Sequence, residues 1–302
     1  MTGIPRLGEL SALAAALSWS LAVILFRRTG ERVSAFALNL FKCALALILF
    51  GATLFLFRQF PERPIAARDW VLLAASGALG IGLSDTLLLM TLNRVGATLQ
   101  AIVATSYSPS IILLSVLFLG ERLTLVQGAG VLVILAAVFS VSLAGGPGGG
   151  REGAVPRRQL VAGILLGLTA TAAQAVSIVM VKPLLEELPL IWANCWRLLG
   201  GLAAMVLVLP LVPARMRRLS TLADRRVWPM MIGASVLGTY VSLLFWLGGM
   251  KYTQASIASV INQTSTLWTF ALAALLLKEP VTARRVVALA LGVAGVAMAT
   301  FG

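Results

Sequence analysis

The chain has 302 residues, of which 59% are hydrophobic and only 12% are charged, and its mean hydropathy is +0.96. About a quarter of the residues of a soluble domain are charged, so this composition excludes a soluble globular protein and predicts helices in a lipid bilayer. In a soluble protein the net charge of +13 would suggest nucleic acid as a partner. Here the cations lie in short breaks between apolar runs, so orientation in the membrane explains them better and no nucleic acid is expected.

Apolar runs between the charges give ten candidate membrane-spanning helices, since about 20 apolar residues cross a hydrocarbon core about 30 Å thick. In chain order they are Leu10–Phe26, Val33–Phe57, Trp70–Leu92, Val95–Gly120, Leu123–Ala144, Leu160–Val181, Leu188–Ala214, Val227–Met250, Tyr252–Leu277 and Val286–Gly302. The sequence has no short segments of alternating polarity typical of a membrane β-barrel, so every run is assigned as a helix. Arg27-Arg28 follows the first run in place of a small-residue cleavage site, so we interpret this run as a retained span.

A sequence repeat relates the two parts of the chain. Arg94–Thr124 and Tyr252–Thr282 lie 158 positions apart, and five pairs are identical at this shift: Ala97/Ala255, Leu114/Leu272, Leu117/Leu275, Glu121/Glu279 and Thr124/Thr282. Nearer the start of each part, three polar residues match three others in order at a shift of 155: Arg27, Asn39 and Lys42 with Lys182, Asn194 and Arg197. A repeat of this kind in an apolar chain predicts two related halves with a site between them.

The stretch Gly145–Glu152 is rich in glycine and contains a proline, so it cannot hold a helix and predicts a linker. We therefore expect a first five-helix repeat at residues 1–144, a linker at 145–159 and a second five-helix repeat at 160–302. Five is an odd number of spans, so the second half enters the membrane from the opposite side. The predicted fold is an all-α membrane protein with ten transmembrane helices in two inverted five-helix repeats.

Three ionisable side chains lie well inside the apolar runs: Lys42, Asp85 and Arg197. A charge at the bilayer centre costs about 2.5–3.5 kcal/mol on insertion scales, so each needs an explanation. Lys42 and Arg197 either extend to the headgroups or face a wet central cavity, where they bind a carboxylate or phosphate of a substrate or pair with Asp85. Asp85 either forms a salt bridge, with Lys42 or a loop arginine, or serves as a proton-coupling carboxylate.

Uncharged polar residues follow helical spacing in several runs. The ninth run carries Ser256, Ser259, Gln263, Thr266 and Thr269 on one side, with Asn262 beside them, and these either line a cavity or bond neighbouring helices. The predicted substrate-binding residues are Lys42, Arg197, Asn39, Asn194, Trp19, Gln174, Gln100, Asn262 and Gln263, with Asp85 as the predicted coupling residue. In the last run Ala288, Gly292, Gly295 and Ala299 form a small-residue stripe that predicts close helix packing.

Glu121 and Glu279 end apolar runs beside loops, and we expect each to cap the helix that follows it, whose first turn favours a carboxylate. The chain contains no histidine, which removes the Ser-His-Asp and Cys-His mechanisms and the common zinc sites. It also contains no Gly-x4-Gly-Lys-Ser/Thr loop for a nucleotide, so neither a metal nor a cofactor is expected. The two cysteines, Cys43 and Cys195, lie inside apolar runs and are expected to be core residues.

Loop charges bear on the orientation of the chain. The loops after the odd-numbered runs hold fifteen lysines and arginines and the other face holds seven, so the positive-inside rule places the termini outside.

Several short motifs together resemble a known family. They are Ser18-Trp19 in the first run, Lys42 and Arg197 in the second and seventh, the helix start Gly96-Ala97-Thr98, Pro109, and Gly120-Glu121-Arg122-Leu123-Thr124. On these residues the chain resembles a ten-helix member of the drug/metabolite transporter superfamily with two EamA domains. The resemblance implies export or exchange of small metabolites through a central cavity, and cytoplasmic termini in place of the external ones that the loop charges predict.

The second half departs from the family pattern at three positions. Lys278-Glu279-Pro280 replaces Gly-Glu-Arg, Leu267 stands opposite Pro109, and Gln174 stands opposite Trp19. Asp85 lies where the family has an aromatic or aliphatic residue, so no role is carried over to it.

The sequence thus predicts a multi-pass inner-membrane secondary transporter, a monomer or homodimer, that exports small metabolites such as amino acids or organic anions by alternating access. Proton coupling through Asp85 is one possible source of energy. The alternatives are a non-transporting scaffold or assembly subunit and an exporter of drugs or cations. An intramembrane enzyme is disfavoured, because Asp85 is the one carboxylate within a predicted span.

Overall fold

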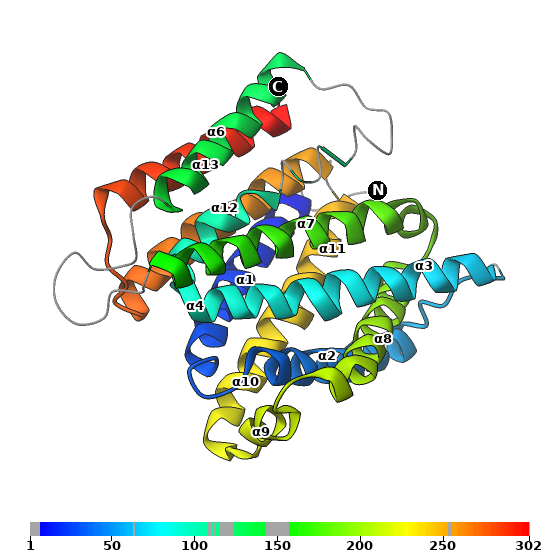
Figure 1. The fold of residues 1–302 in the computed structure, drawn as a ribbon. Coiled ribbons are helices and arrows are strands. Elements are labelled where there is room, and N and C mark those ends of the chain that lie inside the picture. The colour runs from blue at the N-terminus through cyan, green and yellow to red at the C-terminus, as the bar shows by residue number, and fades with distance from the viewer. Residues whose placement is uncertain are drawn as a thin grey trace.

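The computed structural model describes residues 7–62, 64–107, 110, 113–114, 124–142, 157–252 and 255–301. Over these residues the chain folds into helices joined by short connections, with no strand, and the helices pack side by side (Figure 1). The predicted all-α membrane class is therefore confirmed. Glu121 and Pro109 lie outside the described residues.

The helices follow one another in chain order. They are α1 (Leu7–Thr29), α2 (Ala35–Phe57), α3 (Ala67–Gly77), the π-helix η1 (Ala78–Ser84), α4 (Asp85–Ala104), α6 (Leu125–Ser142), α7 (Arg157–Glu187), α8 (Leu190–Val208), η2 (Leu209–Leu211), α9 (Arg215–Ser220), η3 (Thr221–Ala223), η4 (Arg225–Val227), α10 (Trp228–Ser235), the π-helix η5 (Val236–Val241), α11 (Ser242–Tyr252), α12 (Ala255–Leu276) and α13 (Ala283–Phe301).

Within the described residues, six helical stretches are long and apolar enough to cross a membrane: Leu7–Thr29, Ala35–Phe57, Ala67–Ala104, Arg158–Val181, Leu190–Leu211 and Arg225–Trp246. Two shorter apolar stretches, Gly128–Ala137 and Thr264–Leu276, fall inside the predicted fifth and ninth spans. The protein is thus a multi-pass membrane protein. The number of ten spans and the inversion of the halves stay predictions.

Gly96 separates the predicted third and fourth spans. Its backbone, with φ 83° and ψ 172°, leaves the helical region, so a new helical segment starts at Ala97 inside α4. This is the position at which the sequence Gly96-Ala97-Thr98 predicts a helix start. Glycine is required here because it has no Cβ to oppose a positive φ.

The new helical segment is capped from far away in the sequence. The backbone N–H groups of Ala97 and Thr98 donate to the two carboxylate oxygens of Glu279, at 2.8 and 2.9 Å. The expectation that Glu279 caps its own following helix is therefore wrong. The first turn of that helix, α13, is capped instead by Thr282, whose hydroxyl accepts from the N–H of Arg285 at 3.3 Å.

Two π-helices interrupt the bundle at matching places. η1 begins at Ala78 and η5 begins at Val236, and the same shift of 158 positions that relates the sequence repeats relates these two residues. π-Helical turns cost hydrogen-bond geometry and are found mostly at functional sites. Their correspondence adds a structural feature to the repeat.

Three apolar cores hold the helices together, and each contains side chains from both halves. In the first, Phe26 and Leu38 pack with Met231 and Ala273, and in the second, Phe50 packs with residues of α7 and α8. The third joins α4 to α7 and α13. In the described part of the chain, the halves therefore share their apolar cores.

The small-residue stripe of α13 faces α6, and the two helices lie side by side (Figure 1). A Cβ on Gly295 would lie 2.7 Å from Ile134 and 2.9 Å from the carbonyl oxygen of Gly130. A Cβ on Gly292 would lie 3.1 Å from the side chain of Thr105, the residue that follows α4. The predicted packing role is confirmed for these two glycines.

Glycine contacts also set the spacing of α3 and α8, and they generate a stability prediction. A Cβ on Gly77 would lie 1.8 Å from the carbonyl oxygen of Arg197, whereas a Cβ on Gly51 would meet nothing within 4 Å. We expect Gly77→Ala to lower the free energy of unfolding by about 1–3 kcal/mol, because the helices must move apart. Thermal unfolding in detergent measures this loss, with Gly51→Ala as the matched control. Equal midpoints for the two variants would contradict the close approach of the helices.

Candidate functional site

A cluster of buried polar side chains lies where α2 and α3 of the first half meet α7 and α8 of the second half. Its members are Asn39, Lys42, Ser76, Ser177, Asn194 and Arg197, all less than 9% exposed, and the partly exposed Asp85. Burial of polar groups away from water is costly unless they are paired inside the protein. The partners of each side chain therefore show what the cluster can do.

Lys42 forms an ion pair with Asp85, and its side chain is only 4% exposed. The side chain of Asp85 is 22% exposed. Lys42 thus does not extend to the headgroups, and its charge is matched inside the protein. Of the two explanations for Asp85, the salt bridge to Lys42 is the one seen.

Asn39 supports the π-helix that leads to Asp85. Its side-chain amide donates to the carbonyl oxygens of Ile81 at 2.8 Å and Gly82 at 3.2 Å, both inside η1. The same amide reaches the hydroxyl of Thr86 at 2.9 Å. A π-helix displaces backbone carbonyls from their regular partners, and Asn39 satisfies two of them. It therefore positions Asp85, the residue that follows η1.

Arg197 is held by neutral oxygens only. Its Nε donates to the hydroxyl of Ser76 at 3.0 Å, its Nη2 to the hydroxyl of Ser177 at 3.3 Å, and its Nη1 to the side-chain oxygen of Asn194 at 3.4 Å. Asp85 and Tyr107 act on it electrostatically from a greater distance. In the described part of the chain, the guanidinium has no carboxylate within ion-pair distance. Lys42 and Arg197 match in the sequence repeat but differ in their partners. Asp85 neutralises Lys42, whereas only neutral oxygens bind Arg197.

Serine side chains join the two halves beside Arg197. The hydroxyl of Ser76 donates to the carbonyl oxygen of Ser177 at 2.9 Å, and the hydroxyl of Ser177 donates to the carbonyl oxygen of Ser76 at 2.8 Å. Ser84 makes a similar bond to the carbonyl oxygen of Ala170 at 2.8 Å. The sequence analysis missed Ser76. The one signal for it is a small polar residue inside an apolar run, shortly before η1.

Among the predicted site residues whose side chains the structure describes, Gln174 is the one with a buried side-chain polar atom that lacks a hydrogen-bond partner. Its side-chain oxygen is buried and has no hydrogen-bond partner among the described residues. A Cβ on Gly80 would lie 3.1 Å from this oxygen and 2.3 Å from the hydroxyl of Ser177, so Gln174 lies beside a partner of Arg197. Unpaired buried acceptors are rare, and each calls for an explanation such as a ligand.

Three further predicted site residues lie outside this cluster. Trp19 packs against the core around α1, Gln100 is buried in α4, and Asn262 is half-buried in α12. The side chain of Gln263 lies outside the described residues. Substrate binding stays a prediction for these residues and for the predicted site residues inside the cluster alike.

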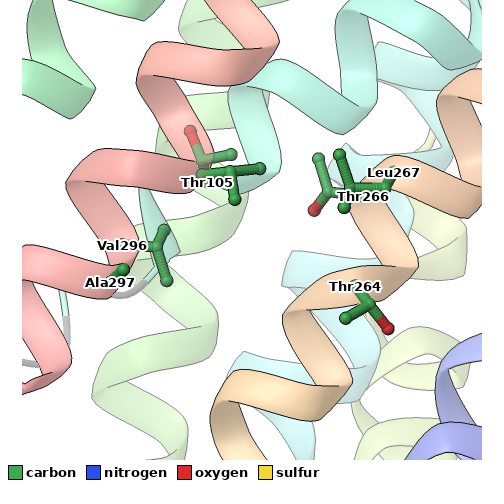
Figure 2. Close-up of a pocket in the computed structure, with 7 residues that line it drawn as sticks. Thr105, Thr264, Thr266, Leu267, Val296 and Ala297 are labelled. Carbon is green, nitrogen blue, oxygen red and sulfur yellow. The ribbon is translucent and has the colours of Figure 1, made fainter.

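Two cavities lie away from the cluster. One, of about 110 Å³, lies between α4, α12 and α13, and Figure 2 shows Thr105, Thr264, Thr266, Leu267, Val296 and Ala297 around it. The other, of about 420 Å³, lies beside Arg28, Arg32 and Arg226, at the end of the molecule where α1, α10 and α12 meet. The polar stripe of the ninth run thus contributes Thr266 to a cavity wall, while Thr269 is buried.

A helical membrane bundle with a buried polar cluster between two repeated halves has the architecture of a multi-pass transporter. The sequence profile of the EamA-like transporter family matches residues 6–143 and 161–301, and the chain belongs to this family. This confirms the resemblance to the drug/metabolite transporters.

Two further comparisons found proteins similar to this chain. The chain is 25% identical over 279 residues to an uncharacterized transporter of Archaeoglobus fulgidus, covering 92% of each sequence. It is also similar in fold to a solved crystal structure, with a TM-score of 0.66 and 20% identity over 97% of this chain and 96% of the other.

The Lys42–Asp85 pair generates a double-mutant prediction. Lys42→Met and Asp85→Leu should each lower the free energy of unfolding by about 3 kcal/mol, because each leaves an uncompensated charge in the bundle. The double variant should lose less than the sum of the single losses, with a coupling of about 2 kcal/mol.

The exposed pair Arg32–Asp224, 3.9 Å apart, provides the control cycle, where the coupling should stay below about 1 kcal/mol. Chemical unfolding in detergent measures both cycles. Additive losses at Lys42 and Asp85 would show that the pair contributes no coupling.

Proposed function

We propose that the protein is a secondary transporter of the inner membrane that exports small metabolites with an anionic group, such as amino acids or organic anions. In this proposal it is not an enzyme. Access to the site alternates as two inverted five-helix halves, residues 1–144 and 160–302, rock against each other. The observation that carries the proposal is Arg197, a buried cation without a carboxylate partner in the described part of the chain.

The donor geometry of Arg197 supports an anionic substrate. A guanidinium has five N–H groups in a planar fork that matches a carboxylate. Three of them are used by Ser76, Ser177 and Asn194, which leaves two for a ligand. A substrate carboxylate there would supply the missing negative charge. Lys42 is less suited to this role, because Asp85 already neutralises it.

The position of the cluster supports transport. The partners of Arg197 come from both halves, Ser76 from α3 and Ser177 and Asn194 from α7 and α8. Relative motion of the halves would therefore change the surroundings of a bound anion. A static scaffold has no need for a buried unmatched cation at the seam between its halves, since such a charge costs stability.

Gln174 narrows the proposed substrate to amino acids. Its unpaired side-chain oxygen can only accept hydrogen bonds, and it lies beside Ser177, a partner of Arg197. An amino acid carries a carboxylate for the guanidinium and an ammonium group for such an acceptor. A drug cation fits less well, because the carboxylate of Asp85 is already matched by Lys42.

Asp85 is the proposed coupling residue. A proton on its partly exposed carboxylate would remove the charge that holds Lys42. Because Asp85 directly follows η1, the broken pair would act on the π-helix beside the proposed substrate site.

Export from liposomes tests the role of Arg197. We expect the purified protein to move at least one member of a panel of amino acids and short dicarboxylates. Arg197→Gln should reduce that flux by about 10- to 100-fold, because a hydrogen bond to a charged group contributes about 1.5–3 kcal/mol. The exposed Arg68 of α3 provides the matched control, Arg68→Gln, with unchanged flux. Wild-type flux from folded Arg197→Gln protein would exclude Arg197 from the site.

Gln174→Leu tests the choice of substrate class. Because the Gln174 oxygen has no partner in the described structure, its removal should leave the melting temperature unchanged or raised. Amino-acid export should nevertheless fall by about 5- to 10-fold, the loss of one hydrogen bond of about 1 kcal/mol or more. Export of dicarboxylates without an amino group should be unaffected. Equal losses for both substrate classes would contradict a contact with the ammonium group.

A further inference from the structure

The turn after α12 presents one carboxylate to the opposite half of the protein. α12 ends at Leu276, Lys278 adopts a left-handed conformation with φ 54°, and the N–H of Glu279 donates back to the carbonyl oxygen of Ala273 at 3.2 Å. This pattern closes a helix C-terminus with a defined turn, and a proline often follows it. Pro280 does so here, and its carbonyl oxygen accepts from the buried Arg285 at 2.8 Å. The turn at the end of α12 and the bond between Pro280 and Arg285 thus fix the backbone before and after Glu279.

The receiving site is the helix start at Gly96. Both carboxylate oxygens of Glu279 are used, one by the N–H of Ala97 and one by the N–H of Thr98. A Cβ on Gly96 would lie 2.7 Å from the nearer oxygen, so the glycine makes room for the carboxylate. A charge-assisted contact of this kind at a helix N-terminus is stronger than one between neutral groups.

We propose that Glu279 fastens the two halves together at the end of the protein that carries Arg28, Arg32 and Arg226, and that this end opens only when the carboxylate leaves Ala97 and Thr98. The proposal rests on the transport function proposed above, because it assigns Glu279 a part in alternating access. In that role Glu279 is a positioning residue, since it acts through the helix that carries Gln100 and Thr105.

The other polar contacts between the halves at this end are weaker or more exposed. Ser34 contacts Arg218 and Thr221 at 3.3 and 3.4 Å, and the exposed pair Arg32–Asp224 lies at 3.9 Å. An exposed bond of 2.7 Å joins Arg28 to the carbonyl oxygen of Leu276. Among these contacts in the described residues, Glu279 alone places a carboxylate on two backbone donors. Loss of the Glu279 contact should therefore shift the equilibrium between the closed and open states of this end more than loss of any of the other contacts.

The geometry also explains how the Glu279 contact alone can keep this end of the protein closed. Glu279 does not touch the tip of a flexible side chain; it binds the backbone at the first residues of a helical segment. The segment moves as a unit, so its N-terminus cannot separate from α12 while both bonds are in place. Release of the carboxylate frees two donors at once, and water can then solvate them.

Distance measurements between spin labels test the proposal without any substrate. We would label Arg94→Cys in the first half and Arg284→Cys in the second, both exposed positions near the contact, in protein whose two native cysteines are buried. The fastened protein should give one narrow distance distribution. Glu279→Gln cannot accept two hydrogen bonds with a full charge, so a longer-distance population should increase about tenfold. Glu62→Gln, an exposed carboxylate outside the contact, should leave the distribution unchanged.

The outcomes separate a gate from a simple helix cap. Glu279→Asp keeps the charge and should restore most of the narrow distribution. If Glu279→Gln lowers the melting temperature but keeps the wild-type distances, the carboxylate is only a cap and the proposal is wrong. If the distances lengthen in protein that moves no substrate from the liposome panel, the fastening stands and the proposed transport function fails. Should Glu279→Gln fail to fold, Glu279→Ala gives the second variant, since it removes the same carboxylate and adds no bulk beside Gly96.

Discussion

The structure depends on one constraint: charges and polar groups in an apolar bundle must be satisfied by the protein itself. Lipid offers no hydrogen bonds, so each buried donor or acceptor needs an internal partner or a ligand. Lys42 forms an ion pair with Asp85, and Arg197 donates hydrogen bonds to three neutral oxygens. Because these partners come from four helices of both halves, the same constraint that makes the charges tolerable also joins the halves at one place.

The two halves repeat the same helices, and they differ in the charged residues that the helices carry. The two π-helices occupy matching positions, and Asn39 and Lys42 of one half match Asn194 and Arg197 of the other. Yet only the first half has an aspartate after its π-helix. The cation of that half is therefore neutralised, and the cation of the other half is left with unused donors. The charged residues between the two similar halves are therefore arranged asymmetrically.

Glu279 shows how the halves depend on each other beyond the central cluster. A helix start leaves backbone N–H groups without partners, and the helical segment that begins at Ala97 lies in an apolar protein where water cannot be relied on. The second half supplies the carboxylate for these groups. A single residue therefore completes a helix in one half from the end of a helix in the other, which links local helix stability to the relative position of the halves.

The amino-acid sequence by itself determined the class of the protein, because length and polarity of apolar runs follow directly from bilayer thickness. It also predicted the helix start at Gly96 and the pairing of Lys42 and Asp85 as one of two alternatives, since both depend on local chemistry. Only the tertiary structure decided that Arg197 has no carboxylate partner in the described part of the chain, that Ser76 belongs to its shell, and that Glu279 caps a helix in the other half. Those facts depend on which helices become neighbours. Ala97 and Glu279 lie 182 positions apart, and no local sequence pattern predicts their contact.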